Sequence, residues 1–422
     1  MFLLIEAKLK RTFWIWHFWA GVIAAPVLFT LSVTGAFYIF KPELELWWYS
    51  EITQASFNAD SDSLEAMVER SAEWVDEDHS LFGFEIEGQS GRAPAVLWKP
   101  DTRGNPIRRI YVDPKVDRVL GEVPQSNLFT IVLAIHRRLM LGTAGRVLTE
   151  LATGWTIVLI STGLVLWWPR SWKNLRGVLV PRLHASRYVK LRDLHTISGV
   201  FIAPAALVIA ITGLLYALVW GGLFLITGFL GGQFDVVTNP PQSVSDIDQS
   251  DLGIDQVMRL MSARKVPTAR MSIAMGNSES DPITIEAGGH YGPSAQRVIH
   301  LDRRTGEILA DHRIEDLPLM AIYANWNYPL HVGSVGGMVT KIIWLIVSVG
   351  LAMLPLFGIW MWLTRRRPRN SGVPKRVEAV WPKWLYVVII AMGIILPTVG
   401  LSMLLTYAFV RWRHREGNSM AA

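Results

Sequence analysis

The chain has 422 residues, of which 51% are hydrophobic and only 18% are charged, and its formal net charge is +6. Globular domains average about 25% charged residues, so this composition excludes an ordinary soluble enzyme. The sequence contains no cysteine, which excludes disulfides, thiol nucleophiles, zinc–thiolate sites and iron–sulfur clusters. Any redox or metal chemistry must therefore use histidine, carboxylates, methionine or a cofactor that these residues hold.

Five apolar stretches are long enough to cross a hydrocarbon core about 30 Å thick, which takes roughly 20 helical residues. In chain order they are Phe13–Phe40, Val147–Trp168, Leu194–Trp220, Thr340–Leu363 and Trp384–Phe409. The first stretch follows basic residues, as a secretory signal does, but it is too long for one and has no small-residue cleavage site. The pattern predicts a retained N-terminal anchor and an α-helical integral membrane bundle of five spans.

Basic residues predict the orientation of these spans. The segments Pro169–Asp193 and Arg365–Lys383 each carry seven Lys or Arg and one acid, so we expect both on the cytoplasmic side, together with the N-terminus. The segments Lys41–Asn127 and Gly221–Leu330 have net charges of −8 and −5 and are expected outside. The overall positive charge is thus a topology signal and gives nucleic-acid binding little support. In conflict with the rule, five spans place a basic C-terminal end outside, with Arg411, Arg413 and Arg415.

The sequence also contains an internal repeat. A template of His, Gly, Pro, Thr-Gly and Tyr in Trp16–Tyr38 recurs without a gap in Leu194–Tyr216, at a constant offset of 178 residues. A second set recurs at an offset of 195 residues, in which His136, Gly142, Gly163, Trp167 and Arg170 match His331, Gly337, Gly358, Trp362 and Arg365. Each half is therefore span, external segment, span. Because two spans return the chain to its starting side, we expect parallel repeats about an axis along the membrane normal, with the fifth span unmatched.

Each external segment is predicted to form a small α+β domain. A helix that opens at Leu64 precedes strand-like runs near 82–86, 95–99 and 108–112, and a helix near Ile254–Ala263 precedes runs near 271–274, 283–286 and 298–301. The expected organisation is a first span in 1–40, a first external domain in 41–130, the second and third spans in 131–220, a second external domain in 221–330, and the fourth and fifth spans in 331–422.

Four of the ten histidines occupy repeat-equivalent places. His17 and His195 lie near the cytoplasmic ends of their spans, and His136 and His331 precede the second span of each half, near the external side. Rotational pseudo-symmetry brings equivalent residues face to face, which predicts one pair on each side of the membrane. Paired neutral imidazoles on facing helices are what two b-type haems require, so we interpret the four histidines as axial ligands. The alternative is that each one is a packed polar residue or lies at the membrane interface.

Residues beside the four histidines fit the same interpretation. Gly21, Gly199, Gly142 and Gly337 are expected to let a planar ring lie against the backbone. Pairing of a histidine with a methionine stays open as an alternative. The six other histidines fall in polar segments, and we expect them to be solvated; they are His79, His184, His290, His300, His312 and His414.

The repeat and the motifs around it resemble those of a known family. The repeated H-x3-G-x4-P…T-G-x2-Y span, the external segments that end in Val-Asp-Pro or Leu-Asp-x2-Thr-Gly-Glu, and the H…G…W span that ends in Arg resemble the PepSY-associated transmembrane proteins over nearly the whole chain. Within this family the sequence is most similar to the ferrisiderophore reductases of bacterial inner membranes. The resemblance implies two periplasmic PepSY-like domains, two haems held by His17, His195, His136 and His331, and reduction of siderophore-bound Fe(III).

The leading hypothesis is therefore a multi-pass reductase of the bacterial inner membrane, with its N-terminus in the cytoplasm. It would move electrons from an unknown cytoplasmic or quinol donor through two b haems to a ferric siderophore, which releases iron because hard oxygen ligands hold Fe(II) less tightly. One alternative is a siderophore or peptide transporter, against which count the few charged residues of the spans, with Glu150 and Lys341 near their ends. The other is a regulatory or scaffolding protein whose external domains bind another protein.

Overall fold

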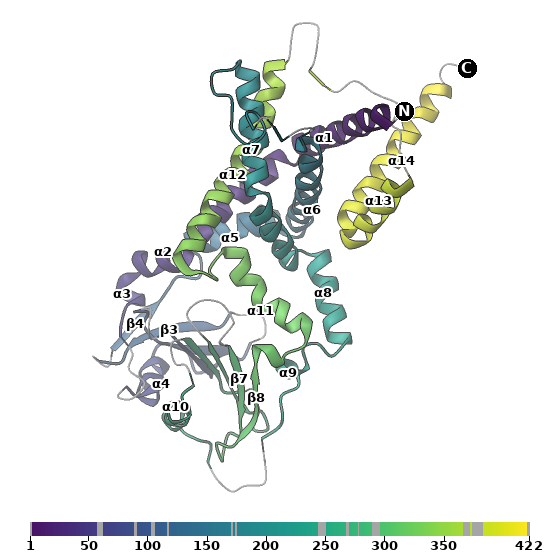
Figure 1. Ribbon diagram of the computed structural model, residues 1–422. Coiled ribbons are helices and arrows are strands. Elements are labelled where there is room, and N and C mark those ends of the chain that lie inside the picture. The colour runs from purple at the N-terminus through teal and green to yellow at the C-terminus, as the bar shows by residue number, and fades with distance from the viewer. Residues whose placement is uncertain are drawn as a thin grey trace.

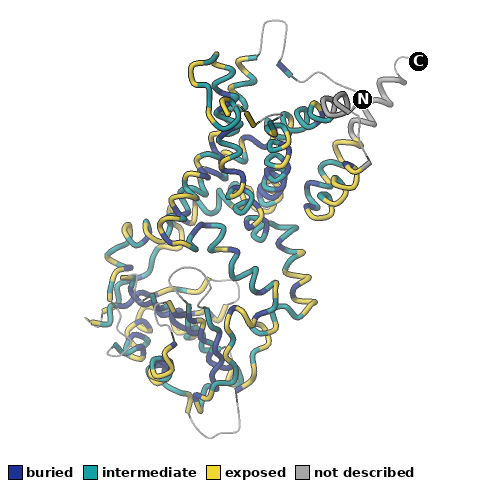
Figure 2. The backbone as a smooth tube through the Cα atoms, in the orientation of Figure 1, coloured by how far each residue is buried: buried dark blue, intermediate teal, exposed yellow. Residues whose placement is uncertain are grey.

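The protein consists of a helical bundle joined to one sheet domain (Figure 1). The computed structural model describes residues 2–56, 62–87, 91–102, 106–115, 118–169, 172–173, 175–243, 250–266, 270–276, 278–288, 296–365, 372–373 and 383–419. Buried residues are concentrated along the sheet and in the middle of the bundle (Figure 2).

Four helices of the described chain are long and apolar enough to cross a membrane, which agrees with the first four predicted spans. They are α1 (Phe2–Tyr38), α6 (Gly142–Trp167), α7 (Arg187–Gly213) and α12 (Gly337–Arg365). Helix α1 packs against α6 and α12, and α7 packs against α6 and α12. The second long helix of each half follows a shorter one, α5 (Leu128–Arg138) before α6 and α11 (Leu319–Val332) before α12. The two halves therefore share one order of elements.

The third predicted span is displaced toward the C-terminus, because α7 begins at Arg187 and ends at Gly213, whereas the prediction ran from Leu194 to Trp220. A 3₁₀ turn, η1 (Leu214–Tyr216), follows, and a separate apolar helix, α8 (Val219–Leu230), begins after it. The backbone turns tightly between them, since a side chain on Gly221 would come within 2.2 Å of the carbonyl oxygen of Leu215. Sequence hydropathy cannot distinguish one long helix from two helices separated by such a turn.

The fifth predicted span, Trp384–Phe409, is not a single helix. It is a hairpin of α13 (Lys383–Ile395) and α14 (Pro397–Ser419), and α14 runs back toward the side of the bundle where α1 begins (Figure 1). Pro397 lacks the N–H that would continue α13, and the helices then touch so closely that a side chain on Gly400 would lie 2.7 Å from the Cα atom of Gly393. The indole of Trp220 donates to the carbonyl of Ile395, the last residue of α13, at 3.1 Å, and such partners satisfy the carbonyls at a helix end in lipid.

Each external segment forms a helix and the three predicted strands, followed by a fourth strand that was not predicted, and the two segments make one sheet instead of two. The first supplies α4 (Leu64–Ala72), β1 (His79–Ile86), β2 (Ala95–Pro100), β3 (Arg108–Asp113) and β4 (Arg118–Glu122). The second supplies α10 (Ile254–Ala263), β5 (Arg270–Ala274), β6 (Ile283–Gly288), β7 (Arg297–Leu301) and β8 (Ile308–Arg313). The strands form a single antiparallel sheet in the order β4-β3-β2-β1-β5-β6-β7-β8.

The junction of the two segments is the β1–β5 pair, in which Gly83 lies opposite Ala274 and Ile86 opposite Met271. A side chain on Gly83 would lie 1.9 Å from the carbonyl oxygen of Ile273, so glycine permits this close pairing. One hydrophobic core continues across the junction between the sheet and helices α4 and α10; it includes Leu64, Met67, Phe84, Ile110, Val257, Met261, Ile273 and Ile285. A shared core of this kind makes the two segments fold as a unit.

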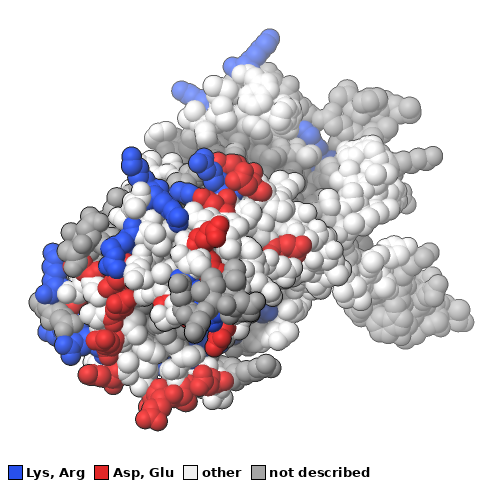
Figure 3. Space-filling view, turned by 90° about the horizontal axis from the view of Figure 1, so that it is seen from below, with Lys and Arg blue, Asp and Glu red and all other residues white. Residues whose placement is uncertain are grey.

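Short elements connect the sheet to the bundle. They are α2 (Lys41–Trp48), α3 (Ser50–Thr53), α9 (Asp235–Thr238) and η3 (Ile314–Asp316). Lys341 of α12, which is buried, forms an ion pair with Glu43 of α2. From the sheet side, acidic and basic side chains are spread over the domain, whereas the helices that extend beyond it are mostly uncharged (Figure 3).

The hairpin predicts that both chain ends lie on one side of the membrane, which also removes the conflict that five spans created. Reporter fusions test this: a fluorescent protein and alkaline phosphatase attached after α14 should report the same side as the same reporters placed before α1. Opposite sides would mean that the last hydrophobic segment crosses the membrane once.

Candidate functional site: two facing histidine pairs

The structure brings the four repeat-equivalent histidines together as two pairs, and each pair draws one ring from each half. The ring centres of His17 in α1 and His195 in α7 are 6.1 Å apart, and those of His136 in α5 and His331 in α11 are 6.3 Å apart. This is the pairing expected from pseudo-symmetry.

The two pairs lie at opposite ends of the bundle. His136 packs against Gly35 of α1, which is eighteen residues after His17 on the same helix. At 1.5 Å per residue, the two positions are about 27 Å apart along α1. This is close to the thickness of a hydrocarbon core, about 30 Å, so one pair lies near each face of the membrane. We call His17/His195 the distal pair and His136/His331 the pair next to the sheet domain.

Each histidine is held by the neighbouring helix of its own half. A threonine that precedes a glycine accepts a hydrogen bond from Nδ1 in three of the four sites, at 3.0 Å each; the pairs are His17 with Thr162, His136 with Thr34 and His331 with Thr212. The following glycine faces Cε1 of the ring, and it is Gly163, Gly35 and Gly213 respectively. In the fourth site Phe357 stands in place of threonine, and Nδ1 of His195 instead donates to the backbone carbonyl of Leu354 at 2.9 Å.

These contacts determine which ring nitrogen carries the proton. Each of the three threonine hydroxyls already donates its hydrogen to its own helix; the acceptors are the carbonyls of Val158, Thr30 and Val208, at 2.8, 2.6 and 2.6 Å. A hydroxyl that has used its only hydrogen can only accept from a neighbour. The backbone carbonyl of Leu354 is likewise only an acceptor. In all four histidines Nδ1 therefore carries the hydrogen, and Nε2 keeps a free lone pair.

The same arrangement is typical of metal-binding histidines, which donate their other N–H to an oxygen of the surrounding shell. An imidazole nitrogen binds a first-row metal ion at about 2.0–2.1 Å and lies about 1.1 Å from its ring centre, so two imidazoles on opposite sides of one ion have centres about 6.3 Å apart. The observed separations are 6.1 and 6.3 Å. Each pair thus has the spacing of two axial ligands.

Neither pair gains a third protein ligand within the described part of the chain. The cluster of three metal-binding side chains found there is Asp76, Asp78 and His79, in the turn before β1. A zinc ion needs four ligands, whereas the iron of a tetrapyrrole already has four ring nitrogens and needs only axial ligands. Two opposed imidazoles backed by glycine therefore fit haem better than a bare ion.

The glycines that contact the histidine rings differ from those predicted. Gly35, Gly163, Gly213 and Gly358 lie against the imidazoles, where an added Cβ would be 3.1, 3.3, 3.2 and 3.7 Å from Cε1. Gly21 and Gly199 instead face leucine side chains, and Gly142 and Gly337 have positive φ at the start of α6 and α12. The prediction assigned each glycine to its neighbour in sequence, whereas the contacts are between helices.

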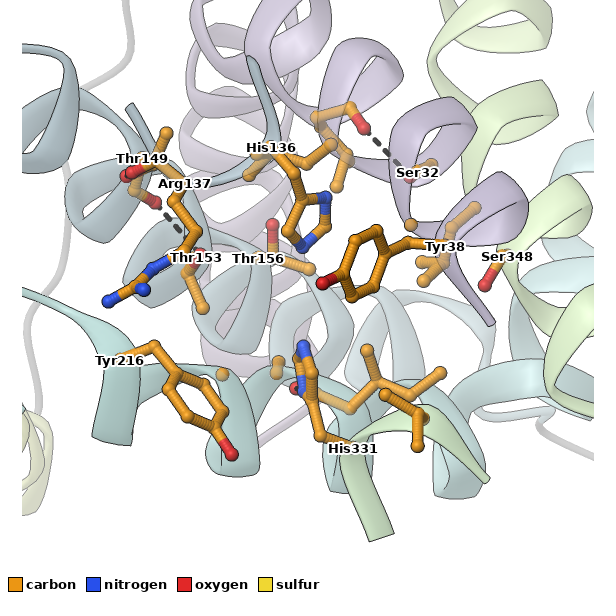
Figure 4. Close-up of a pocket in the computed structure, with 18 of the residues that line it drawn as sticks. Ser32, Tyr38, His136, Arg137, Thr149, Thr153, Thr156, Tyr216, His331 and Ser348 are labelled. Atoms are coloured by element: carbon orange, nitrogen blue, oxygen red, sulfur yellow. Dashed lines mark hydrogen bonds between the residues drawn. The ribbon is translucent and has the colours of Figure 1, made fainter. Parts of the chain in front are cut away.

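A cavity of about 260 Å³ surrounds the pair next to the sheet domain. The imidazoles of His136 and His331 point toward each other across it, and the ring of Tyr38 lies beside them (Figure 4). Its deep wall is mainly apolar and is formed by Leu28, Leu31, Ala206, Ile209, Ala210 and Leu351. Its outer part carries Arg137 and three tyrosines, Tyr38, Tyr216 and Tyr328. Sequence reasoning missed these four residues, although Tyr38 and Tyr216 were visible as repeat positions.

The two charged residues predicted near the span ends are both engaged. Lys341 is paired with Glu43. Glu150 is only 2% exposed, and its carboxyl oxygens accept the backbone N–H groups of Val219 and Trp220, at 2.7 and 3.1 Å. It therefore caps the N-terminus of α8, where a carboxylate also interacts favourably with the helix dipole.

His300 is buried, which contradicts the prediction that it is solvated. It is 1% exposed, Nδ1 lies 3.0 Å from the hydroxyl of Thr284, and Nε2 donates to the carbonyl of Val236 at 3.2 Å. Burial lowers the pKa of His300, and nearby His312 lowers it further, while the Val236 contact opposes both. With both nitrogens occupied, His300 is a structural residue. His290 and His414 lie outside the part of the chain whose side chains the structure describes.

These features define a multi-pass membrane protein with two facing histidine pairs and one sheet domain. The sequence matches the model of the PepSY-associated TM region over residues 14–365. The protein therefore belongs to the PepSY-associated transmembrane family. A comparison with curated proteins found no match.

The Glu150 cap predicts a stability effect. Loss of hydrogen bonds to a buried carboxylate costs about 1.5–3 kcal/mol, so E150A should unfold at a clearly lower temperature in detergent, with E150Q in between because its amide oxygen still accepts one bond. Intrinsic tryptophan fluorescence during heating measures this. S161A, at the surface of the same helix α6, is the control, and equal melting of E150A and S161A would contradict the cap.

Proposed function

We propose that the protein is a haem-dependent reductase of the bacterial inner membrane that delivers electrons to a ferric siderophore on the periplasmic side. The observation that supports this best is the geometry of the four imidazoles. In all four, Nδ1 is used within its own half and Nε2 keeps a free lone pair, while each ring lies 6.1 or 6.3 Å, centre to centre, from a ring of the other half. A metal centre between the rings would satisfy both lone pairs at once.

His17 with His195 and His136 with His331 are the residues that would hold one b-type haem in each pair. When bound there, haem supplies reversible one-electron chemistry at its iron. The protein's own residues have three tasks: the threonines and carbonyls orient the rings, the glycines leave flat space beside them, and the apolar wall excludes water. None of these tasks requires an acid or base, because electron transfer to a chelated Fe(III) moves no proton at the protein.

In this proposal the direction of electron transfer follows from the orientation of the protein in the membrane. The basic segments between α6 and α7 and after α12 would place the distal pair at the cytoplasmic side, where an unknown cytoplasmic or quinol donor supplies electrons. The sheet domain and its neighbouring pair would then lie in the periplasm, where the ferric siderophore docks. Reduction to Fe(II) weakens the hold of hard oxygen ligands and releases iron.

A transporter is a weaker alternative on the same observations. Coupled transport needs ionisable groups inside the bundle that can exchange a proton or ion. Glu150 is occupied as a helix cap and Lys341 as an ion-pair partner. Both residues serve the packing of α8 and α2 and are not free for such exchange.

Proteoliposomes test the proposal. The protein is reconstituted with a reductant sealed inside, and ferrioxamine with an Fe(II)-specific chromogenic chelator is added outside. The expected result is formation of coloured Fe(II) complex with the native chain, and loss of that signal to the protein-free rate in H17A and H331A, since each removes an axial ligand.

H184A is the matched control, because His184 is exposed in the loop before α7 and contacts neither pair. No Fe(II) with the native chain would refute the siderophore proposal, provided that the protein contains haem. A rate in H17A equal to that in H184A would refute the role of the distal pair.

A further inference from the structure

The cavity around His136 and His331 has one polar side, and that side faces the sheet domain. Position along the chain sets the depth: on α1, Leu28 and Leu31 lie deep and Tyr38 lies at the outer end, and in the second half Ala206 of α7 lies deep and Tyr216 of the following turn η1 lies at the outer end. Tyr328 and Arg137 come from the short helices α11 and α5, at the end of the bundle that adjoins the sheet (Figure 1). The cavity therefore suits a ligand with an apolar body and one polar edge.

Arg137 provides a cation at this outer side. Its guanidinium carbon is 6.0 Å from the centre of the Tyr216 ring, and it acts electrostatically on Tyr38, as does Tyr328. No described acid forms an ion pair with Arg137, whereas Arg92, Arg108 and Arg109 of the sheet domain each have an acidic partner. A guanidinium beside an apolar cavity is strongly suited to binding a carboxylate, often with two parallel hydrogen bonds.

The acidic residue of the cavity wall does not neutralise Arg137. Glu150 also lines the cavity, but its two oxygens accept the N–H groups of Val219 and Trp220. The positive charge of Arg137 is therefore left available to a bound anion.

The repeat shows that this cation is not needed to build the histidine pair itself. The counterpart of His136 in the second half is His331, and the residue that follows it is Val332, where the first half has Arg137. Both histidines are nevertheless held in the same way by a Thr-Gly pair. The charge is an addition to one half of the site.

We propose that Arg137, assisted by the hydroxyls of Tyr38 and Tyr328, binds the carboxylate groups of a tetrapyrrole in this cavity, so that its carboxylate-bearing edge faces the sheet domain. This inference rests on the proposed function, because it assumes that the ligand of the His136/His331 pair is haem. It adds the orientation of the ligand, and it assigns a residue that recognises its anionic edge. The substrate side of the protein then meets the polar edge of the cofactor.

Binding of haem and of its dimethyl ester separates charge recognition from the rest of the site, because esterification removes only the carboxylate charges. Apoprotein carrying H17A, which leaves only the pair next to the sheet domain, is titrated in detergent with each compound and followed by absorbance. R137Q should bind haem roughly tenfold more weakly, as loss of a charge-assisted hydrogen bond predicts, and should bind the ester as the parent does. R137K should fall between, because lysine keeps the charge but not the planar fork.

R138Q is the matched control, since Arg138 is exposed like Arg137 but does not line the cavity. Equal affinity of R137Q and R138Q for haem, or an equal loss for haem and ester in R137Q, would overturn the role of Arg137 while leaving haem binding intact. Failure of the parent to bind either compound would instead overturn both this inference and the proposed function. The ester arm reports folding, because a misfolded R137Q would lose both ligands together.

Discussion

The orientation of the four paired histidines depends on the hydrogen bond that each ring makes at Nδ1. In three sites the acceptor is a threonine hydroxyl whose hydrogen is already used by its own helix, and in the fourth it is the carbonyl of Leu354. Because none of these acceptors can donate to the ring, Nε2 is left without a proton and with a free lone pair. The ring centres within each pair are 6.1 and 6.3 Å apart, and we propose that a metal centre held by both rings uses these lone pairs.

Because of these hydrogen bonds, each half of the chain orients its own histidines but needs the other half to complete a pair. Each half orients its own two rings, through contacts of α1 with α5 and α6 or of α7 with α11 and α12. A complete pair exists only when the halves come together. The same dependence recurs outside the bundle, where β1 of one segment pairs with β5 of the other, and at Lys341 and Glu43, which join α12 to α2. Association of the halves is thus fixed at the sheet and at both histidine pairs.

Much of this could be predicted from the sequence, because the signals are periodic or repeated. Hydropathy located four long helices, and a constant offset between His17 and His195 was enough to predict which rings face each other. The supporting threonines were present in the repeat as Thr34-Gly35 and Thr212-Gly213, but their contacts join different helices and leave no trace in local spacing. The continuous sheet was missed for a similar reason, because β1 and β5 are far apart in the sequence. Gly83 pairs with Ala274, 191 residues away, and only the fold brings them together. Pro397 marks the helix break in the sequence, but the hydropathy of Trp384–Phe409 favoured a single span.

The central claim is that the facing imidazoles are axial ligands, and the haem content of the purified protein tests it most directly. We predict a low-spin haem spectrum with two haems per chain by pyridine haemochrome, and one haem per chain in H17A and in H195A, with the same haem lost from both. A colourless native protein would contradict the account. So would loss of different haems from H17A and H195A, because the two rings could not then belong to one pair.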